Sequence, residues 1–311
     1  MTLQQLQYIV ALDTHRNFVK AAEHTFVTQP TLTMQVKKLE DEMGTVIFNR
    51  SKIPLEPTRM GEKIIERARK VLFEANKLKE LIKAEREEIT GSFRLGVIPT
   101  VAPYLIPLFL KSFVEKYPLA HFILEEMQSE DIITRLKKEK IDVGILATPL
   151  DEKELREIPM FYEPFLVYVS KDHSLFKEKE IKEEQLGKEG LWLLNQGHCF
   201  RNQTLNICHN ESTMELQHGF SYESGSIEAL KNMVKSNMGY TLVPELSVLH
   251  ELDSAFVKRI KGKQPVREIS LVVHKSFPKE LLLSELKNHI LKAIPERFIK
   301  DEQTLKVKWR Y

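Results

Sequence analysis

Both cysteines of this 311-residue chain lie in one short stretch, GHCFRNQTLNIC, at residues 197–208. Cys199 and Cys208 are nine positions apart, and His198 and Arg201 stand beside the first of them. A thiol attacks peroxide as a thiolate, and a nearby cation or a helix N-terminus lowers its pKa. Arg201 is such a cation, and residues 200–207 favour a helix whose N-terminal dipole faces Cys199. The stretch therefore carries the residue types for thiol chemistry.

Three interpretations of the pair remain open from the residues alone. Two buried cysteines often act only as small apolar side chains. A metal site is a second option, because His198 and His209 flank the two thiols, although C-x8-C is not a usual zinc spacing. The third is a redox pair, in which a sulfenic acid on one thiol condenses with the other to form a disulfide.

A disulfide here would require a structural change. If residues 199–208 are helical, the two Cα atoms lie about 13–14 Å apart at 1.5 Å per residue. A disulfide needs them within about 7 Å. The segment would have to unwind, and closing a loop of about 10 residues is worth roughly 2.5–3 kcal/mol in the chain-entropy model. A local redox event would thus act as a switch.

The composition indicates in what kind of protein this chemistry would take place. A chain of 311 residues with 42% apolar and 29% charged residues predicts two or three globular domains. No apolar run approaches the roughly 20 residues that span a bilayer, and the first residues lack the basic region of a signal peptide. Two cysteines are too few for a disulfide framework. We expect a cytoplasmic protein.

The first 58 residues predict a winged helix-turn-helix. Residues 3–13 and 18–26 read as helices, and a third helix begins after a Thr28 cap, with Pro30 in its first turn, and ends at Gly44. Residues 46–61 then predict a hairpin wing. The other interpretation is a small helical bundle with solvated lysines. As contacts to base edges we expect Gln29, Thr31, Thr33 and Met34, and as contacts to phosphates Lys37, Lys38, Arg50, Lys52 and Arg59.

The positive balance of this region permits DNA binding without requiring it. Residues 1–70 carry 11 Lys and Arg against 8 Asp and Glu, whereas the whole chain has a net charge of +2. Residues 59–88 predict a long helix whose apolar positions recur at heptad spacing, which is typical of two helices that pair. Packing of this helix on its own domain is the alternative. The heptad positions are Ile64, Ala68, Val71, Ala75, Leu78 and Ile82.

Beyond residue 90 strands and helices alternate, which indicates α/β layers with largely parallel sheets. In such sheets ligands bind beyond the carboxyl ends of the strands, often at helix N-termini. Thr100 follows the strand FRLGVI and so occupies such a position. A plain helix cap is its simplest role.

The N-terminal order resembles that of the LysR-type transcriptional regulators. The likeness is carried by FVKAAEHTFVTQPTLTMQVKKLEDEMGTVIFNR at 18–50 and by PTRMGEKI at 57–64. It implies an α/β protein with a winged helix-turn-helix domain (1–58), a dimerisation linker helix (59–90) and an effector domain (91–311). The effector domain would resemble periplasmic solute-binding proteins, with lobe I at about 91–162 and 267–311 and lobe II at about 163–266. Such regulators bind promoter DNA as homodimers or homotetramers and contact RNA polymerase.

A narrower resemblance is to the OxyR subfamily, whose members sense hydrogen peroxide. It rests on LGVIPTVAPYLIP at 95–107, on the frame of residues 197–208 and on LKNMVKSNMGYTLVPELSV at 230–248. It implies that Cys199 is the peroxide-reactive thiol and Cys208 its resolving partner in a reversible disulfide. The residues matching the surroundings of the reactive sulfur are Thr100, Ser129, His198 and Arg201.

Three positions depart from the pattern of that subfamily. Asn202 stands where an acidic residue is usual, which removes a charge near Arg201. Ser129 stands where a threonine is expected but keeps the hydroxyl. Met34 replaces a more polar residue of the recognition helix, so the resemblance does not carry over the DNA sequence that is read.

Together these features predict a peroxide-sensing regulator, mainly an activator of oxidative-stress genes, with no cofactor, no metal, no membrane association and no enzymatic activity. One alternative is a LysR-type regulator that responds to a small anion between the lobes, for which Thr100 and Ser129 would serve equally well. Another is a thiol peroxidase that uses the same two cysteines. A plain solute-binding protein is disfavoured by the missing signal peptide.

Overall fold

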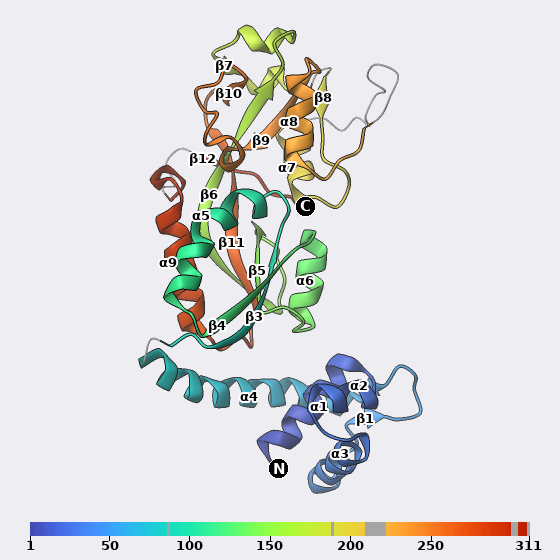
Figure 1. Ribbon diagram of the computed structural model, residues 1–311. Helices are drawn as coiled ribbons and strands as arrows, with labels where there is room; N and C mark the ends of the chain where they lie inside the picture. Colours follow the sequence, from blue (N-terminus) through green and yellow to red (C-terminus); the bar gives the residue numbers. More distant parts are fainter. Residues whose placement is uncertain (86–87, 188–189, 209–221, 300–303, 310–311) are drawn as a thin grey trace. The chain divides into compact units, whose positions relative to one another are not determined.

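A computed structural model describes residues 1–85, 88–187, 190–208, 222–299 and 304–309 (Figure 1). The chain divides into two compact units. One comprises residues 1–88 with 276–281, and the other comprises residues 89–275 with 282–311. Within the described residues, no helix is both long enough and apolar enough to cross a membrane.

The first unit has the predicted helix-turn-helix, wing and long helix. Thr28 caps the third helix by accepting a hydrogen bond from the Thr31 amide, and Gly44 ends it in the left-handed region at φ 62°. The apolar faces of the helices meet in one core that includes Leu12, Leu32 and Val36. The helices are α1 (Leu3–His15), α2 (Phe18–His24), α3 (Gln29–Met43) and α4 (Arg59–Glu85), and the wing strands are β1 (Phe48–Asn49) and β2 (Glu56–Pro57).

A buried carboxylate joins the wing to α3. Glu40 accepts hydrogen bonds from the backbone amides of Ile47 and Phe48 at 2.8 and 3.2 Å, and its other oxygen pairs with Arg50 at 2.8 Å. The strands β1 and β2 are antiparallel, as the hairpin prediction requires. The Glu40 contacts therefore fix where the wing begins relative to α3.

The second unit is built on one connected ten-stranded sheet. The main path runs β4-β3-β5-β11-β6-β10-β7, β12 pairs with β11, and β9 joins β6 to β8. Its strands are β3 (Gly91–Val97), β4 (Ala120–Glu126), β5 (Val143–Thr148), β6 (Leu155–Val169), β7 (Glu180–Ile181), β8 (Leu191–Trp192), β9 (Tyr240–Pro244), β10 (Val257–Ile260), β11 (Gln264–His274) and β12 (Thr304–Lys306). Its α-helices are α5 (Ala102–Lys116), α6 (Ser129–Lys137), α7 (Cys199–Cys208), α8 (Ile227–Lys235) and α9 (Glu280–Ala293).

The sheet is mixed, so the expectation of largely parallel sheets was wrong. β3 pairs in parallel with β4 and β5, but the long strands β6 and β11 run antiparallel to each other. β11 is also antiparallel to β5, and β6 to β9. β6 and β11 are the two longest strands, with 15 and 11 residues, so their antiparallel pairing makes the middle of the sheet antiparallel. Near the start of β11, the pair of Glu163 opposite Arg267 is fully buried.

Candidate functional site

The two cysteines begin and end the helix α7. Both are free thiols, each 3% exposed. The predicted helix is therefore confirmed, and its nine-residue rise separates the two Cα atoms by about 13.5 Å. That separation is about twice what a disulfide allows. In this conformation the two sulfurs cannot join.

Burial has the largest effect on the pKa of the Cys199 thiol. Desolvation raises its pKa above the ordinary value, although the Ser129 hydroxyl, the Arg267 charge and the backbone amides of Phe200 and Cys199 all act to lower it. The expectation of a lowered pKa was therefore wrong for this conformation, because the cost of an ion in an enclosed site exceeds the stabilisation by its neighbours. The amide contribution is that of the helix N-terminus that the sequence predicted.

The buried cation near the thiol is Arg267, which sequence reasoning missed. Its guanidinium is 0% exposed, donates to one carboxylate oxygen of Glu163 at 2.9 and 2.7 Å, and stacks over the Phe200 ring at 5.1 Å. Arg201 was predicted for this role, but its guanidinium donates to the Leu194 carbonyl at 2.9 Å. The signal in the sequence was weak, because Arg267 lies next to Glu268 in a strand that also contains Ser270, and only the apolar residues on either side hinted at burial.

Thr100 belongs to the same network and does not cap a helix. The residue preceding α5 is Val101, and it makes no capping bond through its side chain. Thr100 instead accepts hydrogen bonds from Arg267 through its hydroxyl at 2.7 Å and its carbonyl at 3.0 Å. The simple capping role is thus wrong. Thr100 orients the guanidinium that acts on Cys199.

Ser129 faces the thiol from the first turn of α6. It is 1% exposed, and its oxygen has no partner in standard hydrogen-bonding geometry within the described residues. The group that it does influence is Cys199, whose pKa it lowers. A buried hydroxyl with unused bonding capacity beside a thiol can hold a small polar molecule against the sulfur.

His198 is enclosed directly before Cys199, the first residue of α7. It is 8% exposed, and burial lowers the pKa of its imidazole, which favours the neutral ring. Gly225 lies so close that a Cβ there would stand 2.9 Å from the ring Nε2. His209, the second histidine considered for a metal site, lies outside the described residues.

Cys208 lies in the apolar core at the other end of α7. Burial raises the pKa of its thiol to about 12, and the Gly187 amide acts in the opposite direction. The same amide donates to the Tyr240 hydroxyl at 2.8 Å. A pKa this high keeps the thiol protonated at neutral pH, and a protonated thiol is a poor nucleophile.

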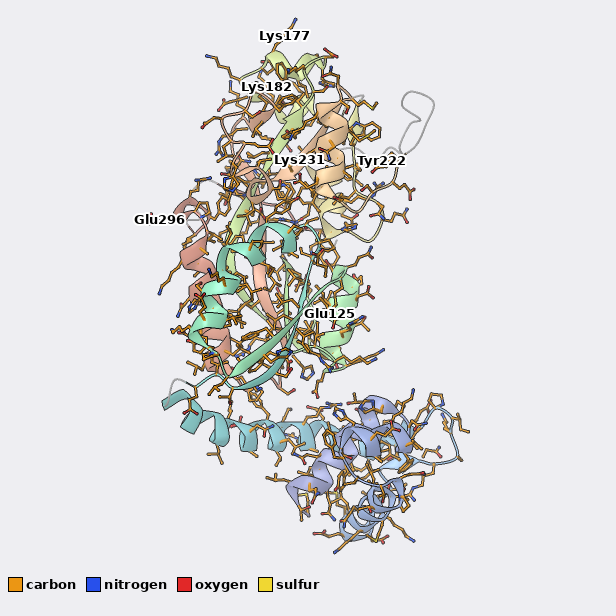
Figure 2. The ribbon with its side chains drawn as sticks, in the orientation of Figure 1. Glu125, Lys177, Lys182, Tyr222, Lys231 and Glu296 are labelled. Atoms are coloured by element: carbon orange, nitrogen blue, oxygen red, sulfur yellow. The ribbon has the colours of Figure 1, made fainter. Side chains whose placement is uncertain are left out.

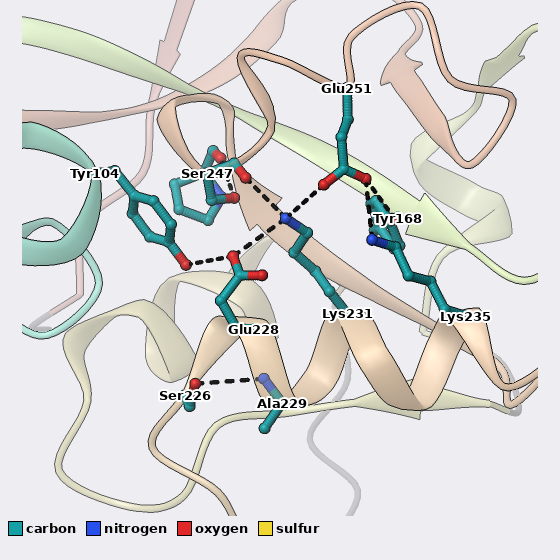
Figure 3. Close-up of polar contacts among 10 residues, drawn as sticks. Tyr104, Tyr168, Ser226, Glu228, Ala229, Lys231, Lys235, Ser247 and Glu251 are labelled. Atoms are coloured by element: carbon teal, nitrogen blue, oxygen red, sulfur yellow. Dashed lines mark hydrogen bonds and ion pairs between the residues drawn. The ribbon is translucent and has the colours of Figure 1, made fainter.

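A second buried cation ties α8 to its neighbours. Lys231 lies on α8 (Figure 2), is 2% exposed as a residue, and pairs with Glu228 at 3.1 Å and Glu251 at 3.0 Å (Figure 3). The Tyr104 hydroxyl on α5 donates to Glu228 at 3.0 Å, and the Tyr168 hydroxyl on β6 donates to Glu251 at 2.8 Å. This network lies on elements other than α7 and connects α5 with α8.

The predicted DNA-contacting side chains are placed on α3, on the wing and at the start of α4. Met34 is 60% exposed, and Gln29, Lys37, Lys38 and Arg59 are also exposed. Thr31 and Thr33 are half-buried, and the Thr31 hydroxyl bonds that of Thr28 at 2.8 Å. In the wing, Arg50 is paired with Glu40, and Lys52 pairs with Glu56 at 2.6 Å.

The heptad positions of α4 divide into two sets. Ala68 is buried in the core of the first unit, and Ile64 packs against that core. Val71 and Leu78 are 44% and 67% exposed, and Ala75 is half-buried. The side chain of Ile82 lies outside the described residues. Packing on the helix's own domain therefore accounts for the first two positions and leaves Val71 and Leu78 exposed.

Comparison with known proteins gives two family matches. Residues 3–62 match the bacterial regulatory helix-turn-helix protein family named lysR, and residues 86–294 match the LysR substrate binding domain. A hydrogen peroxide-inducible genes activator of Haemophilus influenzae is 35% identical over 89% of this chain and 92% of its own length. The DNA-binding transcriptional dual regulator OxyR of Escherichia coli is 34% identical over 89% and 91%.

Solved structures give the same picture. A full-length OxyR variant from Pseudomonas aeruginosa superposes with a TM-score of 0.72 and 33% identity, covering 94% of this chain and 99% of that one. A peroxide-bound OxyR mutant from Corynebacterium glutamicum gives a TM-score of 0.60 and 26% identity, covering 94% and 92%.

Proposed function

Because this chain belongs to the LysR family of bacterial transcriptional regulators, we propose that it senses hydrogen peroxide and controls transcription through a reversible Cys199–Cys208 disulfide. It acts mainly as an activator of oxidative-stress genes. The observation that carries the proposal is that the buried Cys199 thiol lies beside the buried hydroxyl of Ser129 and near a buried cation, Arg267.

The chemistry has two steps. In the first, the Cys199 sulfur attacks one oxygen of hydrogen peroxide; the O–O bond breaks, the sulfur becomes a sulfenic acid, and the departing hydroxide takes up the thiol proton as water. Arg267 stabilises negative charge on the sulfur, and Ser129 offers a hydrogen-bonding group to the peroxide oxygen. His198 and Thr100 complete the walls of this site.

In the second step, Cys208 attacks the sulfenic sulfur. The disulfide forms, and the hydroxyl leaves as water, so that two thiols and one peroxide give one disulfide and two waters. Because the two Cα atoms begin about 13.5 Å apart, α7 must unwind for this step. Oxidation thus remodels a segment of the second unit.

The DNA-binding side of the proposal rests on α3. Its base-contacting residues are Gln29, Thr31, Thr33 and Met34, and the protein positions them in the major groove of promoter DNA. Lys37, Lys38 and Arg59 supply phosphate contacts. Arg50 and Lys52 also reach phosphates from the wing, but each must share its charge with Glu40 or Glu56.

The remaining parts of the proposal concern assembly and setting. The protein is a cytoplasmic homodimer or homotetramer that contacts RNA polymerase and has no enzymatic turnover of its own. Dimerisation through α4 uses the exposed Val71 and Leu78. The division into a DNA-binding domain (1–58), a linker (59–90) and a two-lobed effector domain (91–311) is part of this proposal.

A small anion as the inducer fits the site less well. Arg267 would be its natural partner, yet Glu163 already neutralises this guanidinium. A second anion would place excess negative charge in a dry site, which costs several kcal/mol.

The decisive test treats the reduced protein with one equivalent of peroxide and maps the thiols by mass spectrometry of non-reduced peptides. We expect a Cys199–Cys208 bridge within the parent chain, a stable sulfenic acid in Cys208→Ser and no oxidation at Cys208 in Cys199→Ser. Two unreacted thiols in the parent would contradict the peroxide-sensing function. Repeated consumption of peroxide at a catalytic rate would favour the peroxidase alternative.

A further inference from the structure

The helix between the two cysteines is bound along one side by residues near the end of the chain. Asn202, Gln203 and Asn206 on α7 each donate a side-chain amide hydrogen bond to a backbone carbonyl. Their acceptors are Trp309 at 3.3 Å, Val307 at 2.8 Å and Lys308 at 2.9 Å, respectively. We call residues 304–309 the tail strap. Three consecutive backbone carbonyls of this segment thus accept hydrogen bonds from a single helix.

The tail strap is also anchored on its other side. β12 pairs in parallel with the start of β11, and the Val307 amide donates to the Val266 carbonyl at 2.9 Å. The Trp309 indole donates to the Ala147 carbonyl of β5 at 3.1 Å, and its side chain is 5% exposed. The strap therefore joins α7 to the central sheet.

The donors on α7 lie between the two cysteines in sequence. When residues 199 and 208 approach within disulfide distance, the intervening segment loses its helical rise. Asn202 and Asn206, one helical turn apart, can reach Trp309 and Lys308 together only while that turn exists. Closing the disulfide must break at least part of this contact.

We propose that the tail strap is a regulatory device that holds α7 in its helical, reduced form and sets the rate of the second step. This inference rests on the proposed peroxide-sensing function and adds residues 304–309 to its machinery. Formation of the disulfide releases the strap, and release of the strap promotes formation of the disulfide, because coupling between two sites is reciprocal. The first step at Cys199 does not depend on it.

Trp309 allows the release to be observed directly. The chain has two tryptophans, so Trp192→Phe leaves Trp309 as the single indole. After addition of peroxide we expect the Trp309 emission to shift to longer wavelength at the same rate as the disulfide forms, because a buried indole enters water. In the Cys208→Ser background, where the sulfenic acid forms without a bridge, we expect no shift.

The rate effect is tested by removing two donors from α7. Asn202→Val with Asn206→Val eliminates both amides without adding charge, and valine and asparagine have similar helix propensities. We expect the bridge to close about tenfold faster, equivalent to about 1.4 kcal/mol, with the rate of sulfenic acid formation unchanged. Asn232→Val on the exposed face of α8 is the matched control and should change neither rate.

Hydrogen exchange on the unmutated chain provides a check that needs no variant. The Val307 amide, bonded to Val266, should lose protection on oxidation together with α7. If the disulfide forms while the Trp309 emission and the Val307 protection stay constant, the proposed role of the tail strap is wrong. An unchanged rate of disulfide formation in the double variant would contradict it as well. Absence of any disulfide in the parent chain would contradict the proposed peroxide-sensing function, and therefore also the role proposed for the tail strap.

Discussion

At the scale of single residues, the surroundings of Cys199 come from four separate segments of the chain. Ser129 comes from α6, Arg267 from β11, Thr100 from the loop before α5, and the helix amides from α7 itself. Burial raises the pKa of the thiol, and the neighbours partly offset this effect. The site is therefore a buried enclosure in which the Arg267 guanidinium is held by Glu163 and Thr100, and its charge and the Ser129 hydroxyl act on the sulfur.

Removing the Ser129 hydroxyl should slow the first step. In Ser129→Ala we expect the rate of sulfenic acid formation to fall about tenfold, because a hydrogen bond to a charged group is worth about 1.5–3 kcal/mol. The pKa of Cys199 should rise further, since the hydroxyl lowers it. Ser129→Thr keeps the hydroxyl and serves as the control. Stopped-flow kinetics in the Cys208→Ser background measures both variants, and equal rates for alanine and serine would refute this role.

The rate of the first step should also rise steeply with pH. Because burial places the pKa of Cys199 above its ordinary range, the thiolate fraction grows about tenfold per pH unit throughout the neutral region. The peroxide rate constant in Cys208→Ser, measured from pH 6 to 8, should therefore increase without reaching a plateau. A plateau near neutral pH would mean that the thiol is already ionised and that the buried cation outweighs desolvation.

At the scale of elements, different parts of α7 and of α4 make different contacts. α7 buries Cys199, Phe200 and Cys208 and presents three amide side chains to the tail strap. Asn202 stands where an acidic residue is usual in the OxyR subfamily. Its amide can donate a hydrogen bond to a carbonyl, whereas a carboxylate cannot. The start of α4 serves the core of the first unit, whereas Val71 and Leu78 remain exposed.

Charging the exposed positions of α4 should dissociate the protein without unfolding it. In the double variant Val71→Glu with Leu78→Glu we expect a monomer. The substitutions remove the apolar contact between the two paired α4 helices and place like charges opposite each other. Light scattering after gel filtration gives the mass, and circular dichroism checks the fold. Lys70→Glu, at an exposed position on the same helix, is the matched control. A double variant that keeps the mass of the parent would place the interface elsewhere.

At the scale of the whole molecule, regulation requires that a change in α7 alters DNA binding by the first unit. The largest structural change that the proposed disulfide requires is the loss of the α7 helix, and this change would also break its hydrogen bonds to residues 307–309. Coupling of this kind is a difference in free energy between two states and needs no continuous path of contacts.

The oxidised and reduced proteins should therefore protect promoter DNA differently. We expect a DNase footprint whose extent changes when peroxide is added to the parent and reverts on reduction. The same experiment with Cys208→Ser should give one footprint under both conditions, because the sulfenic acid alone leaves α7 folded. Identical footprints for the two states of the parent would show that the disulfide acts through something other than DNA geometry, such as contact with polymerase.

The sequence by itself determined many of the local elements and singled out Cys199 and Cys208 as a candidate redox pair. Thr28, Pro30 and Gly44 set the ends of α3, and short apolar segments placed strands such as β3, β5 and β11, because caps and local composition act over a few residues. The helical separation of Cys199 and Cys208 also followed from spacing alone. Tertiary structure decided what surrounds the sulfur: Arg267, 68 positions from Cys199 in the chain, is the buried cation, and Arg201, only two positions away, points to a carbonyl. It also made the sheet mixed and brought Trp309 to Asn202. Contacts between distant segments depend on which strands pair and in which direction, and no local pattern of residues encodes that choice.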